Sequence, residues 1–216
     1  VREIGAASGF RVRATEDASV LSRRGLRPFE VVLFLNTTGT ILDDDQRAAL
    51  AAHVRRGGGF MGVHSAADTE HGWPFYARLV GARFLSHPAV QSATFLTEDP
   101  DSPATSHLAR RFQATDEFYD FDRNPREQVH VLLSIDESTY DESATTAATD
   151  DHPMAWCHDV GDGRAFYTAL GHEEALYGER WYRRHLLGGI RIAARKLDAD
   201  CSGPGSRKVR RPRGSL

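Results

Sequence analysis

Two short apolar segments, separated by one helix-length segment, constrain the fold of this chain most strongly. Residues 29–36 read FEVVLFLN, an almost unbroken apolar run that is typical of a strand buried on both faces of a parallel sheet. Residues 59–64 form a second such run. The segment between them has helical spacing, with Asp43 or Asp44 as its N-cap and Gly57 as its C-terminal stop. Strand, helix and strand in this order imply a right-handed crossover, so the sequence predicts an α/β fold with a mostly parallel sheet.

Further elements are expected on both sides of these two strands. The turn Val160–Gly163 predicts an antiparallel hairpin, because glycine supplies the positive dihedral that such turns need. Helices are expected over residues 73–84 and 174–196. Strands are expected over residues 10–14, 89–98, 115–121, 129–136, 153–158 and 164–170. We predict one domain over residues 1–197 and a basic, disordered tail over residues 198–216.

Composition excludes several classes of protein. A net charge of -3 over 216 residues argues against a nucleic-acid-binding protein. No apolar run approaches the roughly 18 residues of a membrane span. Two cysteines, Cys157 and Cys201, are too few for a disulfide framework, which favours a reducing compartment, so we expect a cytoplasmic protein. The chain opens on Val1 inside an expected helix that Gly9 closes, and no strand precedes this helix, so the first strand of the sheet is expected to be missing.

The second apolar strand ends at a histidine among small residues, in the sequence Gly-Val-His-Ser-Ala at residues 62–66. A strand that breaks sharply into a helix through small residues has the geometry of a nucleophile elbow. Here the residue at the bend is His64, and an imidazole near pH 7 is a good acid, base or metal ligand. The alternative is a strand-end histidine without a function.

Polar residues follow apolar strand ends at four places, around His64, His87, the Asp116–Glu117 pair and His172. Because ligands of α/β sheets bind beyond the carboxyl ends of the strands, we expect His64 and His172 to converge. Separated histidines and carboxylates suit a divalent metal such as zinc, with His64 and His172 as ligands. They equally suit metal-free proton transfer. The alternative for the Asp116–Glu117 pair is that both carboxylates face water. The alternative for His87 is a structural role in a loop.

Three longer motifs then identify a family. They are GGGFMGVHSAADTEHGWPFYARLVGARFLSHP at residues 57–88, TDEFYDF at 115–121 and HPMAWCHDVGDGRAFYTALGH at 152–172. With these three motifs in this order, the chain closely resembles the ThuA-like (trehalose-utilisation) family over about residues 1–195. That family is similar to the class I glutamine amidotransferase superfamily, which implies a flavodoxin-like three-layer sandwich.

The resemblance also marks a difference in chemistry. In those amidotransferases the elbow reads G-x-C-x-G, and a later strand ends in His-x-Glu to complete a Cys-His-Glu triad. Here His64 stands where the cysteine would be, while His172 and Glu174 keep the His-x-Glu spacing. Without a thiolate at the elbow, glutaminase activity is expected to be absent. Cys157 lies in a hairpin strand and is not expected to replace it.

The family implies chemistry on trehalose or on a keto-disaccharide derived from it. We expect acid–base catalysis by His64 and His172, with Glu117 or Asp116 orienting one imidazole or binding a sugar hydroxyl. Substrate binding is assigned to Asp68, Trp73, His87 and Glu174, because a carboxylate accepts hydroxyl protons and an indole stacks on a pyranose. The expected partner is a small-molecule sugar, with no nucleic acid or membrane, and a homo-oligomer is compatible with the sequence. The alternative is a non-catalytic sugar-binding or regulatory module on the same fold.

Overall fold

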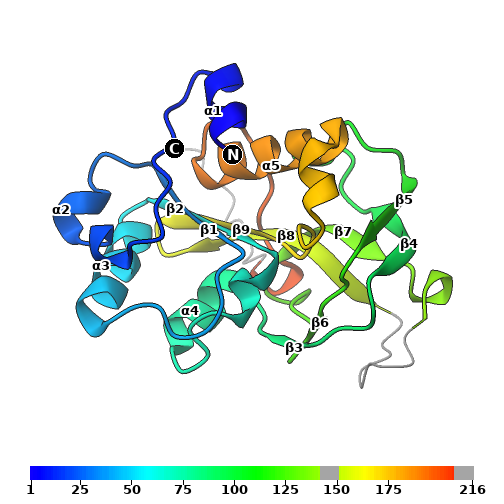
Figure 1. The fold of residues 1–216 in the computed structure, drawn as a ribbon, viewed down its shortest axis with the longest axis horizontal. Coiled ribbons are helices and arrows are strands. Elements are labelled where there is room, and N and C mark those ends of the chain that lie inside the picture. The colour runs from blue at the N-terminus through cyan, green and yellow to red at the C-terminus, as the bar shows by residue number, and fades with distance from the viewer. Residues whose placement is uncertain (142–150, 207–216) are drawn as a thin grey trace, which may run out of the picture.

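A computed structural model describes residues 1–141 and 151–206 of the chain. Within these residues one seven-stranded sheet has the order β1-β2-β9-β8-β7-β4-β5 (Figure 1). In that order the strands are Val31–Leu35, Gly59–Val63, Gly163–Thr168, His152–Val160, His130–Ile135, Gln91–Thr97 and Arg111–Asp116. A separate small sheet pairs β3 (Phe84–Ser86) with β6 (Asp120–Phe121). The α-helices are α1 (Arg2–Ser8), α2 (Arg23–Leu26), α3 (Asp44–Arg55), α4 (Pro74–Val80) and α5 (Arg180–Ala193).

The main sheet is mixed, and its strand directions agree with the α/β prediction. β1, β2 and β9 pair in parallel, whereas the pairs from β9 through β8, β7 and β4 to β5 are all antiparallel. Five of the seven strands therefore run in one direction, and only β8 and β4 run in the other. The predicted hairpin is confirmed as β8–β9, closed at Val160 and Gly163.

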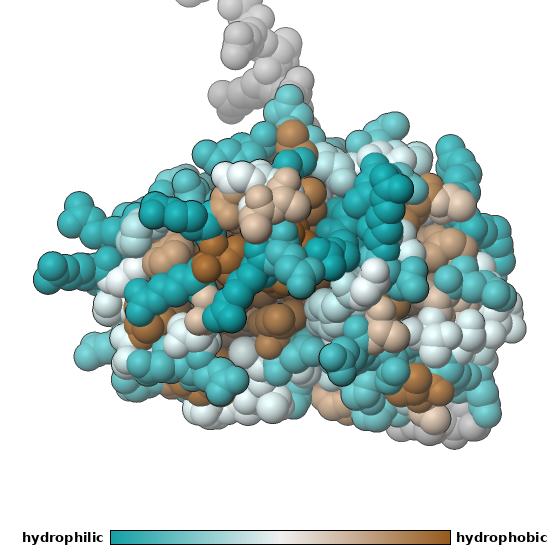
Figure 2. Space-filling view, turned by 45° about the horizontal axis from the view of Figure 1, so that its top comes forward, coloured by the Kyte–Doolittle hydropathy of each residue, from teal (hydrophilic) through white to brown (hydrophobic). Residues whose placement is uncertain are grey.

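Helices cover both faces of the sheet in three layers. In Figure 1, α1 and α5 lie above the sheet and α4 lies below it. α5 contacts β9 and β2, and α4 contacts the same two strands from the opposite side. Every residue of β2 is buried, as expected for a strand covered on both faces. On the side turned forward in Figure 2, polar side chains surround a smaller central group of apolar ones.

The N-terminal segment differs from the prediction. Residues 10–14 form no strand, and they lie against α1, where a Cβ on Gly5 would be 2.8 Å from both the Phe10 carbonyl and the Val12 side chain. β1 is the edge of the sheet, and no strand of the described residues pairs with its outer side. A strand forms only where another offers hydrogen bonds, and residues 10–14 have no such neighbour.

Three other predicted elements change their bounds. The helix expected over 73–84 ends at Val80, because Gly81 has a φ of 106° that other residues rarely adopt. The strand expected over 115–121 is divided between β5 and β6. The last helix begins at Arg180, after a separate 3₁₀ turn at Glu174–Gly178.

The two cysteines form one disulfide, which the inference of a reducing compartment from the cysteine count did not anticipate. Cys157 on β8 is bonded to Cys201, and both are buried. The bond holds residues near Cys201 against the sheet, so the predicted tail is packed at its start; residues 207–216 lie outside the described residues. Disulfides persist in oxidising surroundings. The cytoplasmic location expected from the cysteine count therefore loses that support and stays a prediction. None of the described helices has both the length and the apolar character to cross a bilayer.

Candidate functional site

His64 occupies a strained bend directly after β2. Its φ is 49°, a left-handed conformation that is uncommon outside glycine, and the chain continues into the 3₁₀ turn His64–Asp68. The small neighbours are required by close packing, since a Cβ on Gly62 would lie 3.2 Å from the Cβ of Ala66. The Tyr76 hydroxyl donates to the Ala66 carbonyl at 2.8 Å and holds the turn. The elbow predicted from the small-residue pattern is thus present in the backbone.

The hydrogen bonds of His64 assign its tautomer. Its Nδ1 lies 2.8 Å from the carbonyl oxygen of Ala169, which can only accept, so the proton is on Nδ1. Nε2 then carries a lone pair and lies 3.3 Å from Oε2 of Glu117. Burial lowers the pKa of His64, despite the opposing contributions of the Ala169 carbonyl and Glu117, and this favours the neutral ring.

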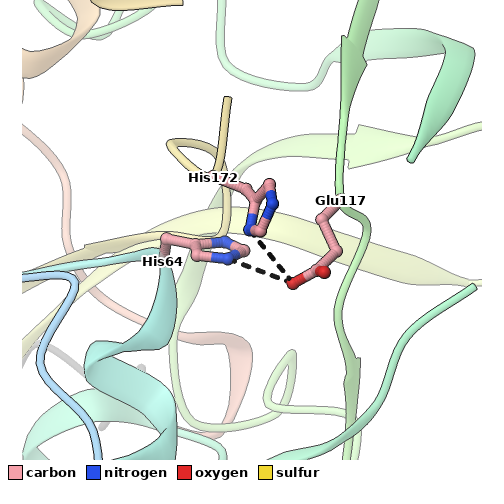
Figure 3. Close-up of side chains that lie close together, drawn as sticks. All are labelled: His64, Glu117 and His172. Carbon is pink, nitrogen blue, oxygen red and sulfur yellow. Dashed lines mark ion pairs between the residues drawn. The ribbon is translucent and has the colours of Figure 1, made fainter. Parts of the chain in front are cut away.

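Glu117 brings three histidines together. Its Oε2 lies 3.3 Å from His64 Nε2 and 3.5 Å from His172 Nδ1, and Figure 3 shows both imidazoles directed at this oxygen. Its Oε1 lies 3.2 Å from Nδ1 of His87. The His64 and His172 ring centroids are 5.2 Å apart. His64 and Glu117 are buried, whereas the side chain of His172 is 42% exposed, so the cluster has one open side.

Three of these residues form a candidate metal site. One ligand atom from each of His64, Glu117 and His172 lies within 4.8 Å of the others. Two imidazole nitrogens and one carboxylate oxygen form a ligand set that zinc accepts in catalytic sites, where a fourth position stays open. The donors therefore suit a divalent metal by type and by mutual distance.

Asp116 lies beside Glu117 in sequence but points away from the cluster. It is fully buried, and its two carboxylate oxygens accept the backbone amides of Gly171 at 2.6 Å and Glu173 at 2.9 Å. Burial raises the pKa of Asp116, and these hydrogen bonds oppose that shift. Asp116 thus fixes the backbone on both sides of His172.

Tyr119 belongs to the site, although sequence reasoning did not select it. Its ring centroid is 4.1 Å from that of His64 and 4.3 Å from that of Phe84. Its hydroxyl interacts with Ser65, and burial raises its pKa, so the phenol stays protonated. The sequence does contain a signal for Tyr119. It lies two positions after Glu117, and in an extended chain such residues lie on the same side, while Phe118 between them enters the core.

The remaining predicted residues are Asp68, Trp73 and Glu174, and their contacts are with residues other than Glu117. Asp68, at the end of the elbow turn, accepts from the Thr38 hydroxyl and pairs with His71 Nε2 at 2.7 Å. Trp73 is half-buried and its ring packs against Phe75 and Tyr76. Glu174 is exposed at the start of a 3₁₀ turn, and no contact within the described residues joins it to the three histidines.

The comparisons with known proteins agree with the resemblance seen in the motifs. A family model described as ThuA, trehalose utilisation, matches residues 1–193. The chain belongs to the ThuA family. No curated protein is significantly similar to this ThuA family protein in sequence.

Solved structures share its fold. A ThuA-like protein from Bacteroides uniformis has a TM-score of 0.75 at 23% identity, covering 88% of this chain and 80% of that one. A second, from Parabacteroides merdae, has a TM-score of 0.71 at 19% identity, covering 96% and 91%. A cytoplasmic protein from Salmonella typhimurium has a TM-score of 0.65 at 10% identity, covering 88% and 84%. At these identities the similarity shows the fold alone.

Proposed function

We propose that this ThuA family protein carries out metal-assisted chemistry on trehalose or on a keto-disaccharide derived from it. The metal is a divalent ion such as zinc, held by His64, Glu117 and His172. One observation carries the proposal: the lone pair of His64 Nε2 faces a carboxylate oxygen at 3.3 Å.

Two electron-rich atoms at that distance repel each other unless a positive charge lies between them. A proton on Nε2 is one solution, but burial lowers the pKa of His64 and works against the imidazolium. A divalent cation is another solution, and it also uses the third donor, Nδ1 of His172, which lies 3.5 Å from the same oxygen. The metal therefore satisfies all three groups at once.

When bound, such a metal supplies Lewis acidity toward a sugar carbonyl or hydroxyl. The protein's own groups then position the substrate and move protons. Nδ1 of His87 lies between two acceptors, Glu117 Oε1 at 3.2 Å and the Pro88 carbonyl at 2.9 Å, so this nitrogen carries the hydrogen. The other nitrogen of this half-exposed ring is left to accept a proton from a substrate hydroxyl. Asp68 and the protonated Tyr119, beside the elbow, are suited to bind further hydroxyls.

Glutaminase activity is absent in this proposal. The elbow carries His64, and both cysteines of the chain are in the Cys157–Cys201 disulfide, so there is no thiol to act as a nucleophile.

The test begins with elemental analysis of the purified protein and zinc titration by calorimetry. Glu117→Gln removes the shared carboxylate and should weaken zinc binding by about 100-fold or more, since even residues that only support metal ligands contribute 10–100-fold. His71→Gln, which changes an exposed histidine outside the cluster, is the matched control and should bind zinc as the wild type does.

Turnover is then screened with trehalose and 3-keto-disaccharides, by product analysis with and without chelator. Zinc binding and turnover that both disappear in Glu117→Gln support the proposal. Wild-type zinc affinity in that variant contradicts the metal site. Sugar binding without turnover, unchanged by His64→Ala, points instead to a non-catalytic module.

A further inference from the structure

A cavity of about 850 Å³ lies at the opposite end of the parallel strands from His64. It is formed where the chain enters β1 and β2, by Glu30 and the glycine turn at Gly57 and Gly58, and by the end of α5 at Ala194. His64 and His172 follow the carboxyl ends of β2 and β9, so the two sites are separated by the length of the strands. None of the residues around Glu117 lines this cavity.

Four arginines line the cavity: Arg23, Arg24, Arg27 and Arg56. All four are exposed, and no carboxylate of residues 1–141 or 151–206 lies within ion-pair distance of their guanidinium groups. Among the described residues that line the cavity, Glu30 is the only acidic one. Unpaired guanidinium groups gathered around one hollow attract a multiply charged anion.

The packing of α2 explains why its arginines are presented together. Leu26 is buried and anchors this short helix against α3. Gly25 lies against the preceding turn, where a Cβ would be 2.2 Å from the Val20 carbonyl oxygen. With one side of the helix held in this way, Arg23, Arg24 and Arg27 project outward.

A buried histidine also lies in the lining of the cavity. His53 is only 9% exposed, and its Nε2 makes no hydrogen bond of normal geometry among the described residues, although the ring interacts with the backbone of Glu30 and Gly59. The ring occupies the space that a side chain at Gly58 would need, since a Cβ there would be 2.3 Å from Nε2. Buried polar nitrogens are paired in folded proteins, with water or a ligand if not with protein. This nitrogen is covered by the protein, so the charge that would attract a ligand to the cavity comes from the four arginines.

We infer that the cavity is a binding site for a small anion that carries phosphate, such as a phosphate ester. Planar guanidinium groups bind phosphate oxygens in pairs of parallel hydrogen bonds, and several such groups suit a dianion better than a single carboxylate. The inference is independent of the metal site and of the sugar chemistry proposed above.

Pyrophosphate is the probe, followed by amide chemical shifts in NMR at constant ionic strength. Saturable shifts are expected at Arg24, Gly57 and Gly58, and none at His64 or His172. The double variant Arg24→Gln/Arg27→Gln should weaken binding by about tenfold or more for each charge-assisted hydrogen bond that it removes. Arg110→Gln removes an exposed arginine beside β5, at the opposite edge of the sheet, and should bind as the wild type does. Because all three arginines are exposed, the melting temperature should not change.

Several results would overturn the inference. They are no saturable binding by the wild type, equal affinity in the double variant, an equally weakened affinity in Arg110→Gln, or shifts centred on His64 and His172. The last pattern would assign the anion to the metal site.

Discussion

The amide of Gly171 donates to Oδ2 of Asp116 at 2.6 Å, joining two residues that are 55 positions apart in the chain. The amide of Glu173 donates to the other oxygen of the same carboxylate. Asp116 is the last residue of β5 and lies inside the protein, while the loop that it holds carries His172. A buried carboxylate thus sets the position of a candidate metal ligand without contacting the metal position itself.

Asp116→Asn should destabilise the protein by about 1–3 kcal/mol, because an amide can offer only one acceptor oxygen and leaves one buried N–H unpaired. Zinc affinity should fall as well, since the loop holding His172 loses its anchor. Urea unfolding and calorimetry measure the two effects. Asp122→Asn is the matched control, because Asp122 accepts the Arg83 amide at 2.9 Å in an exposed loop. Equal effects in the two variants would contradict the positioning role.

Acid should destabilise the protein through His185. Burial lowers its pKa to about 4, from an ordinary value of 6.5. The unfolded chain therefore binds a proton that the folded chain does not, so the contribution to stability is full above pH 6.5 and is lost as the pH falls from 6.5 toward 4. Between pH 7 and pH 5 this loss is about 2 kcal/mol. His185→Gln should reduce the difference in unfolding free energy between these pH values, and an unchanged difference would exclude His185 as its source.

Reduction of the disulfide should lower stability. Cys157 and Cys201 close a loop of 44 residues, for which the loss of chain entropy in the unfolded state corresponds to about 4 kcal/mol. Thermal unfolding with and without a phosphine reductant measures this. Cys201→Ser should lower the melting temperature by as much as reduction lowers that of the wild type, and it should abolish the response to the reductant. A wild-type protein that ignores the reductant under unfolding conditions would show that the bond is not formed.

Gly81→Ala should destabilise the protein by about 2 kcal/mol or more. The φ of 106° is strained for any residue with a Cβ, and that Cβ would lie 2.7 Å from Nε1 of Trp156. Trp156 Nε1 donates to the Val80 carbonyl, so the substitution also disturbs the end of α4. Gly178→Ala is the control, because nothing lies within 4 Å of its added Cβ. Chemical denaturation compares the two variants, and equal stabilities would contradict the account of Gly81.

The parallel half of the sheet was predictable because its sequence signals are local. An unbroken apolar run predicted β1, and glycine with small residues predicted the elbow after β2. His64 and His172 were expected to converge because both follow apolar strands of the predicted sheet. The structure adds that these strands, β2 and β9, are neighbours.

The rest of the site depends on contacts that sequence spacing does not encode. The Asp116–Glu117 pair was expected at the site because it follows a strand end, but the sequence does not show that this strand, β5, is the far edge of the sheet. The sequence also did not show which of the two adjacent acids contacts the histidines. Asp116 accepts the backbone amides of Gly171 and Glu173, whereas Glu117 contacts His64. The pairing of Cys157 with Cys201 and the proximity of Tyr119 to His64 are tertiary contacts of the same kind.

The order of strands in the sheet determines when His64, Glu117 and His172 can be brought together. His64 follows β2 near one edge of the sheet, Glu117 follows β5 at the other edge, and His172 follows β9. No fragment shorter than the segment from β2 to the loop after β9 contains all three donors. The proposed metal site would therefore be complete only when the strands from β2 to β9 have assembled, and zinc affinity would report that assembly.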